Sequence, residues 1–374
     1  MTATNVVVVG ASAAGTAAAE AIRNAGHDGP ITVIGQESDP PYTRPALSKA
    51  LLHGTSTAED VSLPSPREDI ALHLGVRALG LDRSRREVHL SGGETVCYDK
   101  LVIATGARAR TFRPDGRGET VLRSLSDALV LRETLHRINS VVIVGGGFIG
   151  LELASACVAA GLSTTVLARG NGLASGLGPE MSAFLTRAAR THGVDVRCCV
   201  GEVTLEGDPV HAVRTADGIT LEADLVVTAI GCRPNTDWLT DSGIPVDGGV
   251  LVDGRCRVDA DISAAGDVVR MGGGARTPFW TAALDQARVA GAALIRGDEV
   301  APYTSSEFVW TEAFGMTVNI LGPLPVYGTA EALAGELGQR SALLRWRRGD
   351  LCTVAAINHR ISRRKLRSLI GQDA

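Results

Sequence analysis

The chain carries one short pattern twice. A run of β-branched residues, a glycine turn, an alanine- or leucine-rich stretch and a second β-branched run follow in the same order at 6–34 and at 141–167. The β-branched runs are too short for helices, and their continuous apolarity is typical of strands covered on both faces. The repeat therefore predicts an α/β chain with two related units, each with parallel strands joined by a helix.

Both glycine turns have the spacing of a dinucleotide-binding loop. Glycine at these positions permits a tight turn, close approach of the backbone to a pyrophosphate, and close packing of helix on strand. The following helix then presents unpaired amides and its positive dipole end to the phosphates. The positions are Gly10, Ser12 and Gly15 in the first copy and Gly145, Gly147 and Gly150 in the second. Ser12 replaces one glycine, and a small side chain can be accommodated there.

Further residues are expected to lie beside each turn. They comprise the first helical residues after the turn and the closing residues of a third strand in each copy. They are Ala13, Ala14, Ala104, Thr105 and Gly106 in the first copy and Phe148, Ile149, Ala229, Ile230 and Gly231 in the second. A single glycine turn could be a structural device only, but two in the same strand–turn–helix context favour binding of two dinucleotides.

The end of the second strand in each copy bears on the choice of cofactor. Glu37 is placed to accept hydrogen bonds from an unphosphorylated ribose, as in FAD, although it could be an exposed loop charge. In the second copy Ala168 stands where a carboxylate would indicate NAD, and Arg169 follows. Because arginine can pair with a 2′-phosphate, NADPH is weakly favoured; a solvated Arg169 beside an NADH site is the alternative.

The repeat also suggests domain boundaries. We expect a discontinuous FAD-binding domain over 1–115 and 236–300, and an NAD(P)H-binding domain over 116–235. After Gly297 prolines and aromatic residues punctuate the chain, which predicts a small α+β domain over 301–374. The predicted fold is thus two Rossmann-like dinucleotide-binding domains and a C-terminal α+β domain.

Composition excludes other classes. A net charge of −4 argues against wholesale nucleic-acid binding. The apolar stretch at 5–22 superficially resembles a signal peptide, but it lacks a positive leader and carries Glu20. No run of about eighteen apolar residues predicts a membrane span. We expect no membrane and no nucleic-acid partner.

Seven cysteines occur without a C-x-x-C spacing. An odd number of cysteines is consistent with reduced thiols in a cytoplasmic protein, and no metal site is predicted. The adjacent Cys198 and Cys199 lie near an expected strand, so we interpret them as core thiols.

Several stretches resemble the FAD-dependent ferredoxin reductases, a group that includes putidaredoxin and rubredoxin reductases and the reductase components of dioxygenases. This group belongs to the broader pyridine nucleotide–disulfide oxidoreductase fold. The resemblance covers nearly the whole chain. It is carried by P-Y-T-R-P-A-L-S-K at 41–49, A-T-G-A-R at 104–108, L-R-S-L at 122–125 and A-A-G-D at 264–267.

The resemblance implies roles for individual residues. Asp267 is expected to bond the ribityl chain or pyrophosphate of FAD, and Trp310 to flank the isoalloxazine, unless it is a core tryptophan. Lys49 and Glu152 are expected to meet near flavin N5. The other positions that match FAD contacts of the family are Arg44, Ala78, Arg123 and Trp280.

The lysine–glutamate pair makes chemical sense at that place. A lysine beside N5 stabilises negative charge on the reduced flavin, and a carboxylate keeps the lysine charged and oriented. From its position early in a helix, Glu152 could instead complement the helix dipole at the surface.

Two features of the sequence bear on the reaction that the chain catalyses. Disulfide reductases of this fold need cysteines near the first strand pair, and 39–49 contains none. Disulfide chemistry is therefore disfavoured, and the resemblance implies an NAD(P)H:ferredoxin-type reductase. The family stretch R-x-E-S-x-x-N-A reads R-T-P-F-W-T-A-A at 276–283, which motivates an alternative acceptor such as oxygen, a quinone or a small substrate. A redox-sensing interaction protein is a third possibility.

A basic segment near the C-terminus fits an acidic iron–sulfur partner, or is simply a solvated face. This C-terminal basic segment comprises Arg340, Arg345, Arg347, Arg348, Arg360, Arg363, Arg364, Lys365 and Arg367. We expect a ferredoxin-like partner and a monomer or homodimer.

Overall fold

A computed structural model of the chain describes residues 4–305, 307–337, 339 and 341–370. The chain divides into two compact units. Unit 1 comprises Met1–Thr43, Val61–Arg108 and Arg233–Ser306, and unit 2 comprises Arg44–Asp60, Ala109–Cys232 and Glu307–Ala374. The predicted α/β class is confirmed, because each unit contains a parallel sheet and helices.

Unit 1 is built on a five-stranded parallel sheet in the order β18-β7-β1-β2-β3. Its strands are β1 (Val6–Val9), β2 (Ile31–Ile34), β3 (Ile70–His73), β7 (Lys100–Ile103) and β18 (Ile262–Ala264). The helix α1 (Ala13–Asn24) follows β1. The strands β1 and β2 have the bounds that the repeat predicts.

Alternate residues of β1 face opposite sides of this sheet. Val6 and Val8 pack with alanines of α1 and α5, whereas Val7 and Val9 pack toward β4 and β5. The remaining strands and the second helix of the unit are β4 (Ala78–Asp82), β5 (Glu87–Leu90), β6 (Thr95–Cys97), β17 (Val250–Val252), β19 (Val269–Met271) and α5 (Trp280–Arg296). Both faces are buried as predicted, but an antiparallel sheet, β4-β5-β6, covers one of them.

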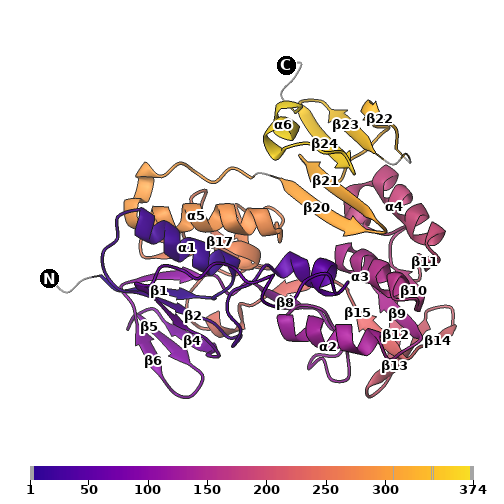
Figure 1. The fold of residues 1–374 in the computed structure, drawn as a ribbon. Helices are drawn as coiled ribbons and strands as arrows, with labels where there is room; N and C mark the ends of the chain where they lie inside the picture. Colours follow the sequence, from indigo (N-terminus) through magenta and orange to yellow (C-terminus); the bar gives the residue numbers. More distant parts are fainter. Residues whose placement is uncertain (1–3, 306, 338, 340, 371–374) are drawn as a thin grey trace. The chain divides into compact units, whose positions relative to one another are not determined.

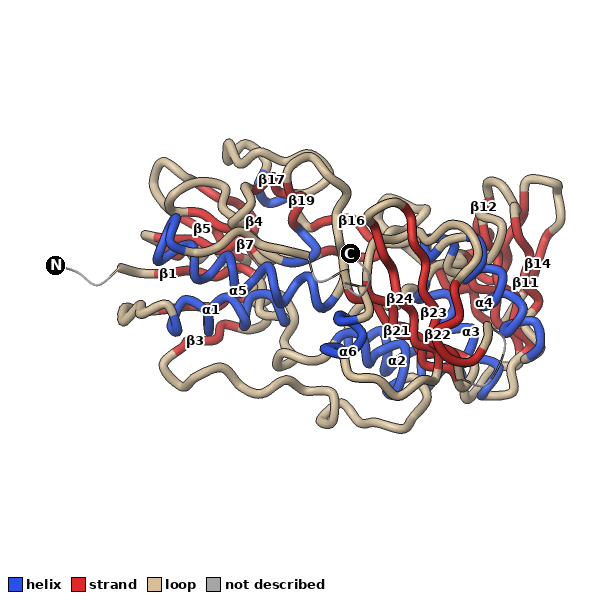
Figure 2. The backbone as a smooth tube through the Cα atoms, turned by 90° about the horizontal axis from the view of Figure 1, so that it is seen from above, coloured by secondary structure: helices blue, strands red, loops and turns tan. Residues whose placement is uncertain are grey.

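The helices α1 and α5 lie side by side, as Figures 1 and 2 show. A Cβ added to Gly291 of α5 would lie 2.4 Å from the carbonyl oxygen of Ala18 in α1. Glycine therefore lets the two backbones approach closely, and small residues fill the interface.

Unit 2 repeats the plan with a four-stranded parallel sheet in the order β11-β10-β9-β15. Its strands are β9 (Ser140–Val144), β10 (Ser163–Ala168), β11 (Asp195–Cys198) and β15 (Leu225–Thr228), and its helices are α2 (Leu125–Leu135), α3 (Phe148–Ala159) and α4 (Pro179–Thr191). An antiparallel sheet packs against one face through Val210 and Val213. That sheet comprises β12 (Val203–Gly207), β13 (Val210–Thr215) and β14 (Thr220–Glu222).

The C-terminal part of unit 2 is a five-stranded antiparallel sheet in the order β20-β21-β24-β23-β22. It comprises β20 (Phe308–Ala313), β21 (Met316–Leu321), β22 (Glu331–Gly335), β23 (Ala342–Arg348) and β24 (Leu351–Ile357), and α6 (Arg363–Ser368) packs on it through Leu366. Glu180 of α4 accepts hydrogen bonds from Trp346 Nε1 (2.8 Å) and Ala330 N (3.0 Å). These bonds fasten the C-terminal sheet to α4.

The short strands β8 (Ala107–Ala109) and β16 (Cys232–Pro234) lie where the chain passes from one unit to the other. Among the helices of the described residues, none has the length and apolarity needed to cross a membrane.

Candidate active site

The first glycine turn brings the start of α1 close to the end of β7. Gly10 has φ +122°, and a Cβ there would lie 2.0 Å from the carbonyl oxygen of Ala104. A Cβ at Gly15 would lie 1.6 Å from the carbonyl oxygen of Gly10, so only glycine permits this packing. Ser12 is the N-cap of α1, and the first turn of that helix, which contains Ala13 and Ala14, carries no acidic side chain.

The second glycine turn has the same geometry. Gly145 has φ +124°, and a Cβ there would lie 2.2 Å from the carbonyl oxygen of Ala229, while one at Gly150 would lie 1.9 Å from that of Gly145. A Cβ at Gly147, the N-cap of α3, would meet nothing within 4 Å. The next residue, Phe148, is half-buried, and Ile149 after it is exposed. Both turns therefore fit a dinucleotide phosphate at a helix N-terminus.

Three predicted positions of unit 1 follow the carboxyl ends of adjacent strands. The Gly10 turn follows β1, Ala104–Gly106 follows β7, and Asp267 lies just after β18. A Cβ on Gly266 would lie 2.9 Å from the Cβ of Ala14, which places Asp267 beside the start of α1. The carboxyl edge of a parallel sheet is where α/β folds bind ligands.

The other predicted residues of unit 1 are Glu37, Thr105, Trp280 and Ala78, and they lie in different parts of the unit. Glu37 lies three residues beyond β2 and accepts a hydrogen bond from Tyr42 Oη at 2.6 Å. Thr105 Oγ1 donates to the carbonyl oxygen of Asn235 at 2.8 Å. Trp280 is the first residue of α5 and is half-buried. Ala78 begins β4, in the antiparallel sheet.

Lys49 and Glu152, both in unit 2, form a buried ion pair. Lys49 Nζ lies 2.8 Å from Glu152 Oε1, and only 8% of Lys49 and 2% of Glu152 is exposed. Lys49 belongs to a single π-helical turn, Leu47–Leu51, in which its own dihedral angles (φ −114°, ψ −112°) are not helical. Single π-turns often occur at functional sites. Because only 2% of Glu152 is exposed, the interpretation of Glu152 as a surface charge is wrong.

Two hydroxyl groups complete the shell of the Glu152 carboxylate. Thr311 Oγ1 donates to Oε1 at 2.7 Å, and Ser48 Oγ donates to Oε2. The sequence did not identify Ser48 or Thr311 as site residues, although each is adjacent to one that it did identify. Only the fold brings them together, across 104 and 159 residues from Glu152.

Other predicted residues of unit 2 surround the pair. The Lys49 ammonium lies 5.6 Å from the centroid of the Trp310 ring, which is half-buried and stacks on Phe308. Arg44 Nη1 donates to the carbonyl oxygen of Arg123 at 2.5 Å. Lys49, Trp310 and the Arg44–Arg123 contact thus belong to the same unit as the second glycine turn.

The residues that bear on the second nucleotide lie at the end of β10. Ala168 is its last residue and is buried, and a Cβ on Gly146 would lie 2.7 Å from the Cβ of Ala168. Arg169 is exposed. Ile230 and Gly231 follow β15, next to β9 in the sheet.

The cysteines are free thiols. Burial raises the pKa of Cys157 and of Cys256 to about 12. The prediction of a core position for Cys198 and Cys199 is wrong, because Cys198 is half-buried and Cys199 is exposed, with its thiol 2.9 Å from Asn171 Oδ1. Cys198 is the last residue of β11, and Cys199 is the first residue after that strand. In the part of the chain that the structure describes, no cluster of three or more His, Cys, Asp or Glu could hold a metal.

The C-terminal basic segment needs one correction. Arg345 is buried and forms an ion pair with Glu331 (2.8 Å), so it is not part of a docking face. The exposed members are Arg347, Arg348, Arg360, Arg363, Arg364, Lys365 and Arg367, while Arg340 lies outside the described residues.

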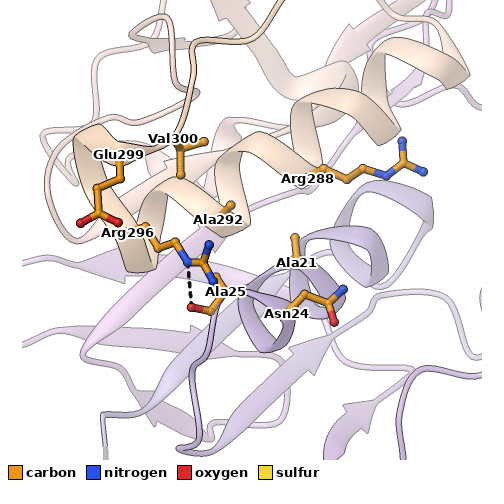
Figure 3. Close-up of a pocket in the computed structure, with 8 residues that line it drawn as sticks. All are labelled: Ala21, Asn24, Ala25, Arg288, Ala292, Arg296, Glu299 and Val300. Atoms are coloured by element: carbon orange, nitrogen blue, oxygen red, sulfur yellow. Dashed lines mark hydrogen bonds between the residues drawn. The ribbon is translucent and has the colours of Figure 1, made fainter.

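A pocket of about 490 Å³ lies between α1 and α5 (Figure 3). It is lined by Ala21, Asn24, Ala25, Arg288, Ala292, Arg296, Glu299 and Val300. Arg296 Nε donates to the carbonyl oxygen of Ala25 at 3.1 Å, and Arg288 pairs with Asp285. None of the predicted site residues lines this pocket.

Two glycine turns of dinucleotide-binding geometry and a buried lysine–glutamate pair are the arrangement expected of a pyridine-nucleotide oxidoreductase. A family model described as pyridine nucleotide–disulphide oxidoreductase matches residues 4–290. The chain belongs to the pyridine nucleotide–disulphide oxidoreductase family. As a member of this family it is an oxidoreductase that uses FAD and a pyridine nucleotide.

Individual relatives align over almost the whole chain. Putidaredoxin reductase of Pseudomonas putida is 32% identical and is covered over 91% of its length by 98% of this chain. The ferredoxin–NAD(+) reductase component of the biphenyl dioxygenase system of Paraburkholderia xenovorans is 32% identical (94% of this chain, 90% of the relative). Rubredoxin–NAD(+) reductase of Pseudomonas putida is 34% identical (86% and 87%).

Solved structures agree. The reductase fold in a covalent putidaredoxin reductase–putidaredoxin complex has a TM-score of 0.88 at 31% identity, covering 99% of this chain and 93% of that chain. A ferredoxin reductase of Rhodopseudomonas palustris has a TM-score of 0.86 at 30% identity, covering 95% and 91%. The resemblance to ferredoxin reductases is confirmed. The relatives named as NAD(+) reductases give no support to the lean toward NADPH.

Proposed function

We propose that this chain is an FAD-dependent NADH reductase of a ferredoxin-type iron–sulfur protein. The observation that carries the proposal is the buried Lys49–Glu152 ion pair. A buried, oriented cation is suited to a cofactor that gains negative charge on reduction. Bound FAD would accept hydride from the nicotinamide and release electrons singly.

The domains and binding residues follow from this proposal. Residues 1–115 and 236–300 would bind FAD, 116–235 the nicotinamide nucleotide, and 301–374 would form the C-terminal domain. Arg44, Lys49, Arg123 and Trp310 would contribute to FAD binding from outside the first glycine turn. The proposed FAD residues around that turn and sheet are Gly10, Ser12, Ala13, Ala14, Gly15, Glu37, Ala78, Ala104, Thr105, Gly106, Asp267 and Trp280.

The proposed nucleotide residues belong to the second turn and its surroundings. Gly147 leaves open space at the N-terminus of α3, and the helix amides there would bind the pyrophosphate. The set is Gly145, Gly147, Phe148, Ile149, Gly150, Glu152, Arg169, Ala229, Ile230 and Gly231. The names of the relatives favour NADH as donor. Arg169 is the one residue that favours NADPH, through a 2′-phosphate.

In this proposal Lys49 supplies positive charge to the reduced cofactor, and Glu152 keeps the ammonium charged and oriented. The acceptor is inferred from the relatives, which are named as reductases of ferredoxin, rubredoxin and putidaredoxin. The exposed part of the C-terminal basic segment supports an acidic partner. We further propose a cytoplasmic location, because the seven cysteines are free thiols.

Anaerobic spectrophotometry tests the acceptor. Catalytic amounts of the FAD-loaded protein with NADH are expected to reduce a large molar excess of a [2Fe–2S] ferredoxin. If NADH bleaches the flavin but the ferredoxin stays oxidised, the acceptor assignment is wrong. Rapid peroxide formation in air would then indicate oxygen as acceptor. Very slow bleaching with a change in oligomeric state would indicate a redox sensor instead.

A further inference from the structure

We propose that Ser48 and Thr311 are positioning residues of the reduction centre. Their hydroxyl groups hold the Glu152 carboxylate in the one orientation that aims the Lys49 ammonium. The inference rests on the proposed function, since it assigns Lys49 to the bound flavin. It adds two residues that touch neither cofactor nor substrate in the proposal and act through Glu152.

Three segments of unit 2 meet at this carboxylate. Glu152 Oε1 accepts from Lys49 Nζ (2.8 Å) and from Thr311 Oγ1 (2.7 Å), and Oε2 accepts from Ser48 Oγ. Lys49 and Ser48 lie in the π-helical turn, Glu152 in α3 and Thr311 in β20. Bonds to both oxygens prevent rotation of the carboxylate about its last side-chain bond.

Burial makes these bonds consequential. Ser48 is 2% exposed and Thr311 is 1% exposed. A buried polar group without a partner is costly, and a buried charge without one is more so. If one hydroxyl is lost, the least costly response is for the carboxylate to turn or for water to enter, and either moves the ammonium that it holds.

The groups around Glu152 suit a carboxylate that accepts hydrogen bonds. A carboxylate only accepts, whereas a protonated carboxyl must donate its own hydrogen to some acceptor. Three donors converge on Glu152, so the arrangement suits an ionised glutamate and a charged lysine.

A second contact fixes where Thr311 lies. Ser155 Oγ, one turn further along α3, accepts from the Phe314 amide at 2.7 Å. Two bonds from α3 thus set the position of β20 and of the turn that follows it, and Trp310 is set with them.

The test compares isosteric variants of the FAD-loaded protein. Thr311→Val and Ser48→Ala remove one hydroxyl each, whereas Thr311→Ser keeps the hydroxyl at position 311. Thr353→Val is the matched control, because Thr353 is a buried threonine of the same sheet whose hydroxyl donates elsewhere, to Pro323 O at 2.7 Å. The measurements are the limiting rate constant of flavin reduction, the Kd for NADH, and the flavin midpoint potential.

We expect Thr311→Val and Ser48→Ala to lower the limiting rate constant by about 10–100-fold, as small misplacements of a reacting group do. The Kd should change little, the midpoint potential should become more negative, and Thr311→Ser should behave like wild type. Rates and potentials equal to those of Thr353→Val would overturn the inference. The midpoint potential can be measured with a chemical reductant in place of NADH, so it decides the inference even if NADH fails to reduce the wild-type protein. Such a failure would count against the proposed function alone.

Discussion

The Glu152 carboxylate illustrates how much one residue depends on its neighbours. Moving a carboxylate and an ammonium out of water is costly, and their attraction offsets that cost only if further hydrogen bonds satisfy the remaining sites. Ser48 and Thr311 supply such bonds to Glu152. A buried pair of this kind contributes little net stability, so stability alone does not account for it.

The energetics of the pair can be tested by a double-mutant cycle. Glu152→Gln leaves the Lys49 charge buried without its partner and should destabilise unit 2 by about 3–5 kcal/mol. Adding Lys49→Met removes that charge, so the double variant should be more stable than Glu152→Gln. Chemical unfolding of the FAD-loaded proteins measures the stability of Glu152→Gln, of Lys49→Met and of the double variant. A loss in the double variant equal to the sum of the losses in the two single variants would show that the two side chains are not coupled.

The thiols provide a second test at the residue scale. Burial raises the pKa of Cys157 and Cys256 to about 12. At pH ~8 only about one such thiol in 10⁴ is ionised, and the thiolate is the reactive form. Native protein should therefore label at the exposed Cys97 and Cys199, and not at Cys157 or Cys256 until it unfolds, as peptide mapping after alkylation would reveal. Rapid native labelling at Cys157 would contradict the structure.

At the scale of elements, two glycines of the second glycine turn have different tasks. Gly150 is required for packing, because a Cβ there would lie 1.9 Å from the carbonyl oxygen of Gly145. Gly147 has space around it, and its proposed task is to let the phosphate approach the backbone. We therefore expect Gly150 to serve stability and Gly147 to serve nucleotide binding.

Alanine substitutions separate these roles. Gly150→Ala should cost about 1–3 kcal/mol through overpacking of α3 on β9. Gly147→Ala should leave the melting temperature near wild type but raise the Kd for NADH. Gly176→Ala is the control, since a Cβ there also meets nothing within 4 Å. Calorimetry and fluorescence titration give the two readouts; an unchanged Kd for Gly147→Ala would remove Gly147 from the nucleotide site.

The sequence predicted the repeated elements well because they are local. Buried runs such as Val6–Val9, followed by glycine turns, specify strand and helix through short-range chemistry. The strands β4–β6 and β12–β14 were not predicted, because their apolar residues alternate over only a few positions. The contact of Thr311 with Glu152 depends on long-range packing, which no local pattern in the sequence encodes.

At the scale of the whole molecule, charge is distributed unevenly. The chain carries a net charge of −4, yet its C-terminal basic segment exposes seven basic residues, Arg347, Arg348, Arg360, Arg363, Arg364, Lys365 and Arg367. Arg363 also lies over the Phe308 ring, with its guanidinium carbon 4.1 Å from the ring centroid. Such a concentration of charge steers an acidic partner and accelerates association at low salt.

Charge reversal tests this steering. Arg364→Glu with Arg367→Glu should lower the rate of ferredoxin reduction at low ionic strength by about tenfold or more, with a smaller effect at high salt. Flavin reduction by NADH should be unchanged. Arg85→Glu, on an exposed turn of unit 1, is the matched control. If the double variant and the control reduce ferredoxin equally at every salt concentration, the partner docks elsewhere.

Stopped-flow reduction of the FAD-loaded protein by NADH and by NADPH, in parallel and without oxygen, tests the central claim most directly. The proposed function predicts that NADH bleaches the flavin at least as fast as steady-state turnover with ferredoxin, and that NADPH does so much more slowly. Failure of both nucleotides to bleach the flavin on that timescale would contradict the reductase assignment. A strong preference for NADPH would keep the reductase and return Arg169 to the role of a 2′-phosphate ligand.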